Sequence, residues 1–242
     1  MICCIPTKGR PATKTHRLFE AAGIPCYHFV EPQELALYGS LKSVVSVEQN
    51  DMGVSFVRNK ILDWANERGH EWIIICDDDV TSFGYYDGKN HTCDAAIWHK
   101  LMEKAKKLPF EVVGINYRQH AWHEKTQYSI NKKFAEVCAA FNVGKIFWRY
   151  KSDTKEDRDF AMQTIQNGNG ILRFNKYFFN APEVGTNVGG LHELYKSKRD
   201  AVWAKKIVAD WHPHAEIVTK AGRVDAKINL ADFAKKVGKV VK

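Results

Sequence analysis

The sequence predicts an α/β protein whose mostly parallel sheet is flanked by helices. Strand-like apolar segments alternate with helical patterns through the first half of the chain. One of them, 72–76, is continuously apolar, as expected of a central strand buried on both faces. This strand leads directly into Asp77-Asp78-Asp79. Because ligands of open α/β sheets bind in the crevice at the carboxyl ends of the strands, we expect a site at this edge.

The elements of the first half follow from periodicity and from glycines that end helices. The clearest helix begins at Gly53 and ends at Gly69, because apolar side chains recur between them at helical spacing. In chain order, the expected elements are strand 2–6, helix 13–22, strand 26–30, strand 44–47, helix 53–69, strand 72–76, helix 94–108 and strand 111–115.

The pattern changes near residue 120 without a linker, so we expect one domain spanning 1–242 with a small antiparallel extension in its second half. A capping box is expected with Asp153 as N-cap and Glu156 at N3, in a helix that Gly168 ends. The other expected elements are hairpin strands 134–141 and 145–150, strand 171–179, a glycine-rich loop 183–191, helix 194–208 and a basic C-terminal tail from Thr219.

The acid cluster at 77–79 predicts a divalent cation. Three adjacent carboxylates repel one another and are costly to desolvate unless a cation neutralises them. Oxygen ligands favour Mg²⁺ or Mn²⁺ over zinc or copper. The alternative is a solvated turn in which Asp79 caps the segment that follows.

The net charge of +8 over 242 residues favours a polyanionic partner such as nucleic acid, a nucleotide or a phosphorylated donor. A solvated basic surface with no specific partner explains the same charge. No apolar stretch approaches the ~20 residues that span a bilayer, and no signal peptide is recognisable. The six cysteines lack metal-binding spacing, which predicts reduced thiols and a cytoplasmic protein.

Short motifs follow one another in order from about residue 2 to 214: Ile5-Pro6-Thr7-Lys8-Gly9-Arg10, Gly53–Asn59 with its Arg58-Asn59, Asp77-Asp78-Asp79, Lys155-Glu156-Asp157, Gly185–Leu191 and His212-Pro213-His214. In this order they resemble a GT-A-type, Rossmann-like glycosyltransferase. Within that class the chain resembles the TET-associated glycosyltransferase family of bacteriophages. The resemblance implies a nucleotide-sugar half at about 1–120 and an acceptor half at about 121–242.

For the donor, the resemblance implies a nucleotide sugar, with UDP the implied nucleotide, held through Mn²⁺ or Mg²⁺ at an Asp-x-Asp-type motif. Asp79 and Asp77 are then the metal ligands, and a late histidine, His212 or His214, completes the site; the alternative is a pair of surface histidines. The remaining donor-binding candidates are Pro6, Thr7, Lys8, Arg10, Glu31, Arg58, Asp78, Gly189, Gly190 and His192. Each of these also has a simpler explanation as a polar loop residue or a snorkelling cation.

For the reaction, the resemblance implies a carboxylate base at Glu156-Asp157. Such a base takes the proton of an acceptor hydroxyl as the oxygen attacks the anomeric carbon. A capping box explains Glu156 without catalysis, so we assign the base to Asp157. Direct attack of this kind inverts the anomeric configuration.

For the acceptor, the resemblance implies 5-hydroxymethylcytosine or a related hydroxymethyl pyrimidine in phage DNA, and the positive charge agrees. Aromatic residues interleaved with cations at 147–151 and 173–177 could hold a base that has been extracted from the duplex. The competing explanation, which fits most of these residues better, is two ordinary strands with buried aromatic and exposed basic side chains. A free hydroxymethyl nucleotide is an alternative acceptor.

Three other functions remain open from the sequence. The same donor site would serve a GT-A enzyme acting on a glycan, a lipid carrier or a protein. A metal-dependent nuclease could use Asp77, Asp79 and Asp157 in a two-metal site. A non-catalytic DNA-binding module would need no acid cluster, and no helix-turn-helix or zinc-finger spacing is recognisable.

Overall fold

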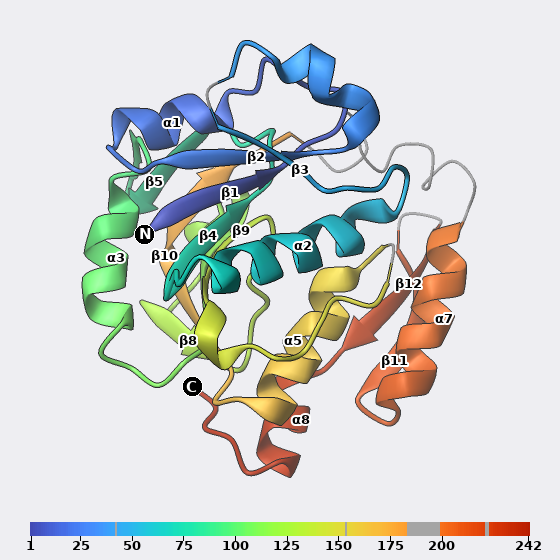
Figure 1. Cartoon of the computed structure of the whole chain (residues 1–242). Helices are drawn as coiled ribbons and strands as arrows, with labels where there is room; N and C mark the ends of the chain where they lie inside the picture. The colour runs from blue at the N-terminus through green and yellow to red at the C-terminus, as the bar shows by residue number, and fades with distance from the viewer. Residues whose placement is uncertain (42, 153, 183–198, 221–222) are drawn as a thin grey trace.

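The computed structural model describes residues 1–41, 43–152, 154–182, 199–220 and 223–242. Its centre is a mixed sheet in the order β3-β2-β1-β4-β9-β7-β10-β5-β6, with β8 beside β10 (Figure 1). The strands are β1 (Ile2–Pro6), β2 (Cys26–Val30), β3 (Val44–Ser46), β4 (Trp72–Cys76), β5 (Ser82–Tyr86), β6 (Asn90–Cys93), β7 (Val112–Tyr117), β8 (Tyr128–Ile130), β9 (Cys138–Asn142) and β10 (Ile171–Asn180).

Most strands share one direction, which confirms the predicted α/β class of GT-A type. Strands β1 to β4 are mutually parallel, and β7 and β10 run the same way. Strand β9 is inserted antiparallel between β4 and β7. From β1 the chain proceeds to β2 and β3 on one side and returns to β4 on the other. The carboxyl ends of β1 and β4 therefore flank a topological switch point, where ligands bind in sheets of this kind.

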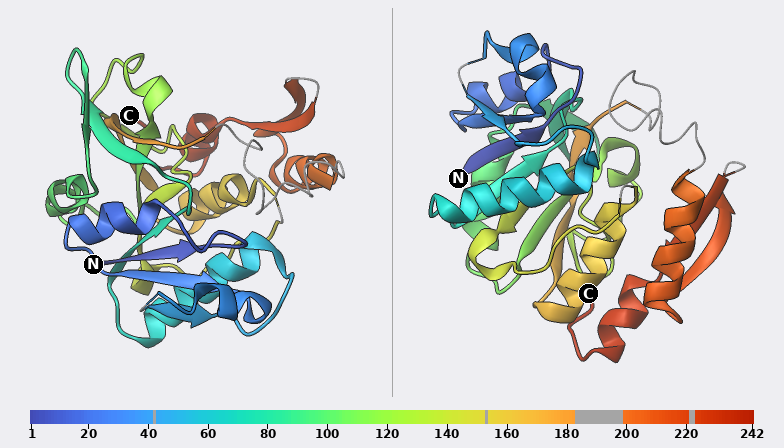
Figure 2. Two further views of the ribbon diagram at one scale, coloured as in Figure 1. Left: turned by 90° about the horizontal axis from the view of Figure 1, so that it is seen from above. Right: turned by 45° about the vertical axis from the view of Figure 1, so that its right-hand side comes forward.

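Helices cover both faces of the sheet (Figures 1 and 2). The helical segments are α1 (Thr15–Ala21), η1 (Pro32–Tyr38), α2 (Gly53–Glu67), α3 (Ile97–Ala105), α4 (Arg118–Ala121), η2 (Val143–Lys145), α5 (Glu156–Asn167), α7 (Arg199–Trp211) and α8 (Leu230–Lys236). Alternate side chains of β4 pack into two hydrophobic cores, one on each face of the sheet. Ile73 and Ile75 pack with α2 and α5, whereas Ile74 and Cys76 pack with α1 and α3. Burial on both faces explains why this strand is continuously apolar.

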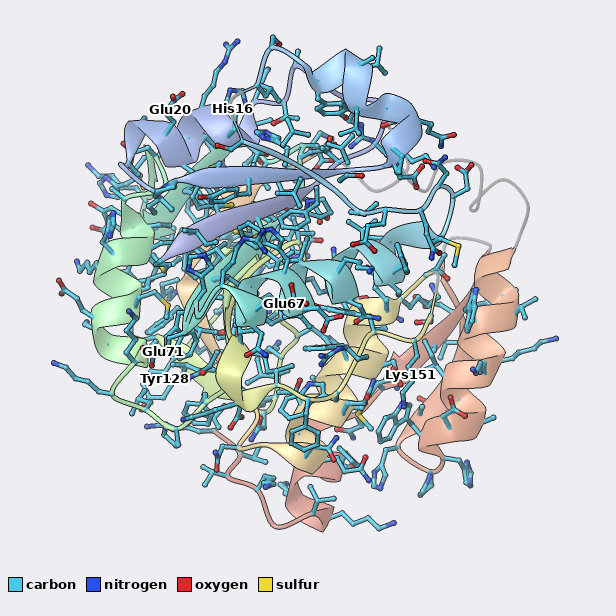
Figure 3. All side chains as sticks on the ribbon, viewed as in Figure 1. His16, Glu20, Glu67, Glu71, Tyr128 and Lys151 are labelled. Atoms are coloured by element: carbon cyan, nitrogen blue, oxygen red, sulfur yellow. The ribbon has the colours of Figure 1, made fainter. Side chains whose placement is uncertain are left out.

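The predicted basic tail is wrong. Strands β11 (Ala215–Lys220) and β12 (Arg223–Ile228) pair antiparallel as a hairpin, followed by α8. Helix α7 packs on this hairpin through Ala204 and Ile207, and Phe233 of α8 joins the core beneath α5 (Figure 2). At the end of the chain, Lys242 exchanges backbone hydrogen bonds with Ile130, and its Nζ donates to Tyr128, which is labelled in Figure 3. Packing of the apolar residues on one face of the hairpin, rather than the local positive charge, determines the structure of this segment.

Two local predictions in the second half are also wrong. Residues 145–150 form no strand; the side chain of Asn59 instead exchanges hydrogen bonds of 2.9 Å with both backbone groups of Tyr150. Helix α5 begins at Glu156 with Lys155 as its N-cap in the left-handed region, at φ +58°, so Glu156 is not at N3 of a capping box. Gly168 ends this helix as expected. The hairpin β5–β6 was not predicted.

Among the described residues, no helix is both long and apolar enough to cross a membrane. All six cysteines are free thiols, as predicted, and four of them, Cys3, Cys4, Cys76 and Cys138, are buried. Burial raises the pKa of the Cys3, Cys4 and Cys76 thiols, which keeps them protonated and unreactive.

Candidate active site

The site begins where the loops after β1 and β4 meet. Thr7 Oγ1 donates a hydrogen bond of 2.7 Å to Asp78 Oδ2, and Arg10 Nη1 donates one of 2.6 Å to Asp78 Oδ1. Asp78 is buried, and burial raises the pKa of its carboxyl against the opposing effects of Thr7 and Arg10. Both oxygens of Asp78 are thus used inside the protein, so its contribution is to join the two loops.

A buried tyrosine that the sequence analysis missed completes this junction. Tyr38, at the end of η1, accepts a hydrogen bond of 2.9 Å from the backbone N–H of Arg10. Its hydroxyl also lies 3.0 Å from Thr7 Oγ1. Because the single hydroxyl proton of Thr7 goes to Asp78, Tyr38 is the donor in this second bond. The chain Tyr38–Thr7–Asp78 fixes the loop after β1 against the end of β4.

Arg58 of α2 links the acid cluster to the start of α5. Its guanidinium lies 2.9 Å from Asp77 Oδ1 and 3.4 Å from Glu156 Oε1, and it packs 5.6 Å from the ring centroid of Tyr150. Arg58 and Glu156 are both buried. Burial raises the pKa of Glu156 to about 7, even though Arg58 opposes the shift. Arg58 therefore supplies a cation to two motifs that are far apart in the sequence.

Asp77 and Asp79 are the accessible carboxylates of the cluster. The side chain of Asp79 is 28% exposed and that of Asp77 33%, against 6% for Asp78, and Asp79 Oδ2 lies 3.7 Å from Arg10 Nη1. Both residues thus reach solvent at the switch point. No group of three or more His, Cys, Asp or Glu close enough to hold a metal is found in the described part of the chain. Two carboxylates fit Mg²⁺, which takes its other ligands from water and substrate phosphates.

Asp157 lies beside a second carboxyl group, Glu136, that the sequence analysis missed. The two side chains are hydrogen-bonded, and burial together with Asp157 raises the pKa of Glu136 to about 8. A hydrogen bond between two carboxyl groups requires one shared proton, and the raised pKa places that proton on Glu136. Asp157 accepts this hydrogen bond from Glu136.

The backbone next to Glu136 is strained. Val137 has φ +60°, a region that β-branched residues rarely occupy. Its carbonyl accepts a hydrogen bond of 2.9 Å from the backbone N–H of Asp77. Strain of this kind persists where the surrounding structure over-determines it, and it is common at functional sites. The turn at Val137 thus ties Glu136 to the end of β4.

The C-terminal hairpin holds the first turn of α5 in place. Asp225 of β12 accepts from Lys155 Nζ at 2.8 Å and from Arg158 Nη1 at 2.7 Å. Trp211 Nε1 donates to Asp159 Oδ1 at 2.8 Å. Glu156 and Asp157 consequently lie in a first helical turn that is anchored on both sides by these contacts. The hairpin predicted as a tail is part of the support of the site.

With this geometry in place, the sequence as a whole can be compared with known proteins. A model of the TET-associated glycosyltransferase family matches residues 1–190. The chain belongs to the TET-associated glycosyltransferase family. It is therefore a glycosyltransferase, and the matched region contains the motifs around Asp78, Arg58 and Asp157. Comparison with curated proteins gives no match.

Solved structures resemble this glycosyltransferase only in general arrangement. A197 from STIV has a TM-score of 0.47 at 12% identity, covering 74% of this chain and 83% of that chain. Mannose-1-phosphate geranyltransferase from Thermus thermophilus has a TM-score of 0.45 at 12% identity, covering 98% and 96%. UDP-glucose pyrophosphorylase complexed with UDP-glucose has a TM-score of 0.42 at 12% identity, covering 75% and 92%.

Other candidate donor-binding residues of the glycosyltransferase are engaged with one another. Lys8 Nζ lies 2.8 Å from Glu31 Oε2 and 2.5 Å from Asp51 Oδ1. The carboxylates raise the pKa of Lys8, although its partial burial opposes them. Glu31 is buried at the end of β2, and Pro6 is the last residue of β1. These residues line the same carboxyl edge of the sheet, next to the Thr7–Asp78 junction.

The predicted late histidines lie between α7 and β11. His212 is exposed, and the ring of His214 packs 5.3 Å from that of Phe233 in α8, with its Nε2 buried and lacking a hydrogen-bond partner. The structure does not group either histidine with Asp77 or Asp79. Four other predicted positions, Gly185, Gly189, Gly190 and His192, lie outside the described residues.

The aromatic residues of the run 147–151, predicted to hold a base, are mostly internal, whereas Phe174 and Tyr177 of the other run are half-buried. Trp148 and Tyr150 are buried; Trp148 donates to Thr164, and Tyr150 stacks on Phe160 with centroids 4.0 Å apart. Phe147 is 72% exposed. The explanation as buried aromatics therefore holds for most of the run 147–151, although the segment is not a strand.

Proposed function

We propose that this glycosyltransferase transfers a sugar from a UDP-sugar to the hydroxyl group of 5-hydroxymethylcytosine, or a related hydroxymethyl pyrimidine, in phage DNA. The reaction depends on Mn²⁺ or Mg²⁺ and inverts the anomeric configuration. One observation carries the proposal: Arg58 joins the carboxylates at the β1–β4 switch point to the first turn of α5. This link supports a single site in which one part binds the donor and the other accepts the proton.

On the donor side, Asp79 and Asp77 are the residues that would hold the cation. Bound there, such a cation supplies charge stabilisation for the departing nucleotide diphosphate. Arg10, close to both Asp78 and Asp79, adds a second positive charge at the same place. Arg58 and Arg10 also partly neutralise the acid cluster within the protein, so the cluster tolerates burial before donor arrives.

On the acceptor side, Asp157 is the general base. The acceptor oxygen attacks the anomeric carbon, the bond from that carbon to the diphosphate oxygen breaks, and the electron pair leaves with UDP. The hydroxyl proton passes to Asp157. The protonated Glu136 orients Asp157 by donating to one of its oxygens, which leaves the other oxygen for the acceptor. Direct displacement by this route inverts the anomeric centre.

The acceptor assignment rests on the family and on the charge. The family description associates these transferases with TET enzymes, and a net charge of +8 suits a DNA partner. Reduced cysteines suit the cytoplasm of an infected bacterium, where such a modification of DNA would take place.

The donor half of the proposal is tested by thermal unfolding with UDP, GDP, CDP and their sugars, with and without Mn²⁺. A ligand at ~100 times its dissociation constant adds about 2.7 kcal/mol to the free energy of unfolding. Asp79→Ala should abolish the Mn²⁺-dependent part of the shift and lower turnover at least ~100-fold. Asp87→Ala, which removes an exposed carboxylate between β5 and β6, is the matched control. An unchanged Mn²⁺-dependent shift in the Asp79 variant would contradict the proposed metal site.

The acceptor half is tested by incubating the enzyme with UDP-sugars and either hydroxymethylated or unmodified DNA. Mass spectrometry of the nucleosides should show sugar only on the hydroxymethylated base. NMR of the product should show an inverted anomeric centre; retention would exclude direct attack assisted by Asp157. Transfer to a glycan, lipid or protein acceptor with none to hydroxymethylated DNA would assign the enzyme to a different acceptor class.

A further inference from the structure

A polar pocket opens at the edge of the sheet, and all of its lining residues except Arg173 had no role in the sequence analysis. Its volume is about 470 Å³, within the usual range of small-molecule sites of roughly 300–1,000 Å³. Its lining residue Asn116 lies near the carboxyl end of β7, a strand that runs in the same direction as β4. The pocket is therefore at the same edge of the sheet as the acid cluster. It is lined by Asn116, His120, His123, Glu124, Lys133 and Arg173.

One arginine connects this pocket to the base. Arg173 Nη2 donates to Glu124 Oε1 at 2.6 Å inside the pocket. The same guanidinium interacts with Glu136 and lowers the pKa of that carboxyl, against the larger effect of burial. Glu136 in turn is hydrogen-bonded to Asp157. Arg173 thus links the pocket electrostatically to the pair of acids that is proposed to handle the acceptor proton.

The pocket is electropositive. Arg173 and Lys133 share a single carboxylate, Glu124, at 2.6 Å and 3.4 Å, so their combined charge exceeds that of their partner. His120 and His123 add two hydrogen-bonding rings. A surplus of cations and donors around one anion suits a ligand that carries phosphate.

An exposed aromatic residue stacks on one of the residues that line the pocket. Trp122, which directly precedes the lining residue His123, is 53% exposed and stacks on the His123 ring with centroids 3.4 Å apart. Large aromatic side chains are usually buried, and base stacking on an exposed one is a common mode of single-strand recognition. Trp122 is therefore available to stack on a base, whereas Trp148 and Tyr150 are buried and are not available.

We propose that this pocket binds the acceptor strand of DNA, with Trp122 stacking on a nucleobase and Lys133 and Arg173 contacting phosphate. The inference rests on the proposed function, since it assigns a surface to the proposed DNA acceptor. Unpaired bases are the fitting ligand, because an exposed tryptophan face is available only to a base that has left the duplex. A glycan acceptor without phosphate would gain little from this arrangement of cations.

The test compares DNA affinity with donor affinity in the same variants. A fluorescein-labelled single strand containing 5-hydroxymethylcytosine is titrated with protein, and anisotropy gives the dissociation constant over a series of salt concentrations. Trp122→Ala should weaken binding ~5- to 150-fold, as expected for one lost stacking contact. Lys133→Ala should weaken binding and reduce the slope of log affinity against log salt by about 1.

The controls are Phe147→Ala and Lys145→Ala, which remove an exposed aromatic and an exposed cation from another part of the surface. Their DNA affinity should remain within about twofold of the parent protein, as for surface changes outside an interface. Parent-like affinity of the Trp122 and Lys133 variants, or a loss confined to Phe147→Ala, would overturn the proposal. So would a parent protein that binds no DNA.

Thermal shift with UDP and Mn²⁺ separates this inference from the proposed function. If the Trp122 variant loses DNA affinity but shows the same thermal shift with UDP as the parent protein, the DNA-binding pocket and the donor site are both supported. If DNA affinity depends on Trp122 while no nucleotide shifts the parent protein, the pocket stands and the donor assignment fails. Circular dichroism of each variant confirms that the fold is intact.

Discussion

Replacing Glu136 by Gln should stabilise the protein at neutral pH, although it alters a residue of the candidate site. The substitution keeps the shape of the side chain and an N–H donor for Asp157, but removes the ionisable group. Burial and Asp157 raise the pKa of Glu136 from 4.5 to about 8. The folded protein therefore keeps a proton that the unfolded chain releases above pH ~4.5.

The magnitude follows from this difference. At pH 7, about 2.5 pH units above the ordinary pKa of a glutamate, ionisation of Glu136 lowers the free energy of the unfolded chain by about 3 kcal/mol. The folded protein, in which Glu136 keeps its proton, does not gain this stabilisation. Part of the Glu136 side chain reaches solvent, which screens the interaction and reduces the effect to ~1–2 kcal/mol. The penalty is absent below pH ~4.5, grows as pH rises, and is complete above pH ~8. The parent protein therefore becomes less stable relative to the Gln variant as the pH rises.

Urea unfolding at pH 4.5, 6, 7 and 8 measures the effect. The Glu136→Gln variant and the parent should coincide at pH 4.5, and the variant should be more stable by ~1–2 kcal/mol at pH 8. Glu67→Gln, which changes an exposed residue at the end of α2 (Figure 3), controls for loss of one negative charge. A difference that does not grow with pH, or a less stable variant at pH 8, would refute the shared-proton account.

Two further predictions concern stability. Arg58→Met should cost ~3–5 kcal/mol at pH 7 in urea unfolding, because it leaves the buried Glu156 and the partly exposed Asp77 without their cation. The loss should shrink at pH 5, where protonation removes the unpaired charges, and a cost independent of pH would contradict this reasoning. Gly84→Ala should lower the free energy of unfolding by ~1–3 kcal/mol, because the added methyl group meets the His91 carbonyl and the Phe178 ring. The control Gly144→Ala, with open space around it, should be neutral. Equal thermal midpoints for the two variants would show that β5 and β10 adjust without strain.

Local sequence patterns were sufficient to predict the strands that are buried on both faces and the helices that cover them. Continuous apolar runs and helical periodicity are local signals, so β1, β2, β4, α2 and their order could be read directly. The acid cluster after β4 was equally visible, because the end of a strand and a run of aspartates are both local. The ordered motifs were sufficient to indicate the family, which the match over residues 1–190 shows.

Which charges neutralise one another became apparent only in the folded chain. The cluster at 77–79 suggested a metal as the source of positive charge, whereas the folded chain also brings Arg58 and Arg10 to it from separate elements. Glu136 and Trp122 had no local signal, since a lone acid or tryptophan in an irregular segment looks like any other loop residue. Burial, pairing and strain depend on residues distant in sequence, and the fold creates them only when β9, α5 and the C-terminal hairpin meet the end of β4.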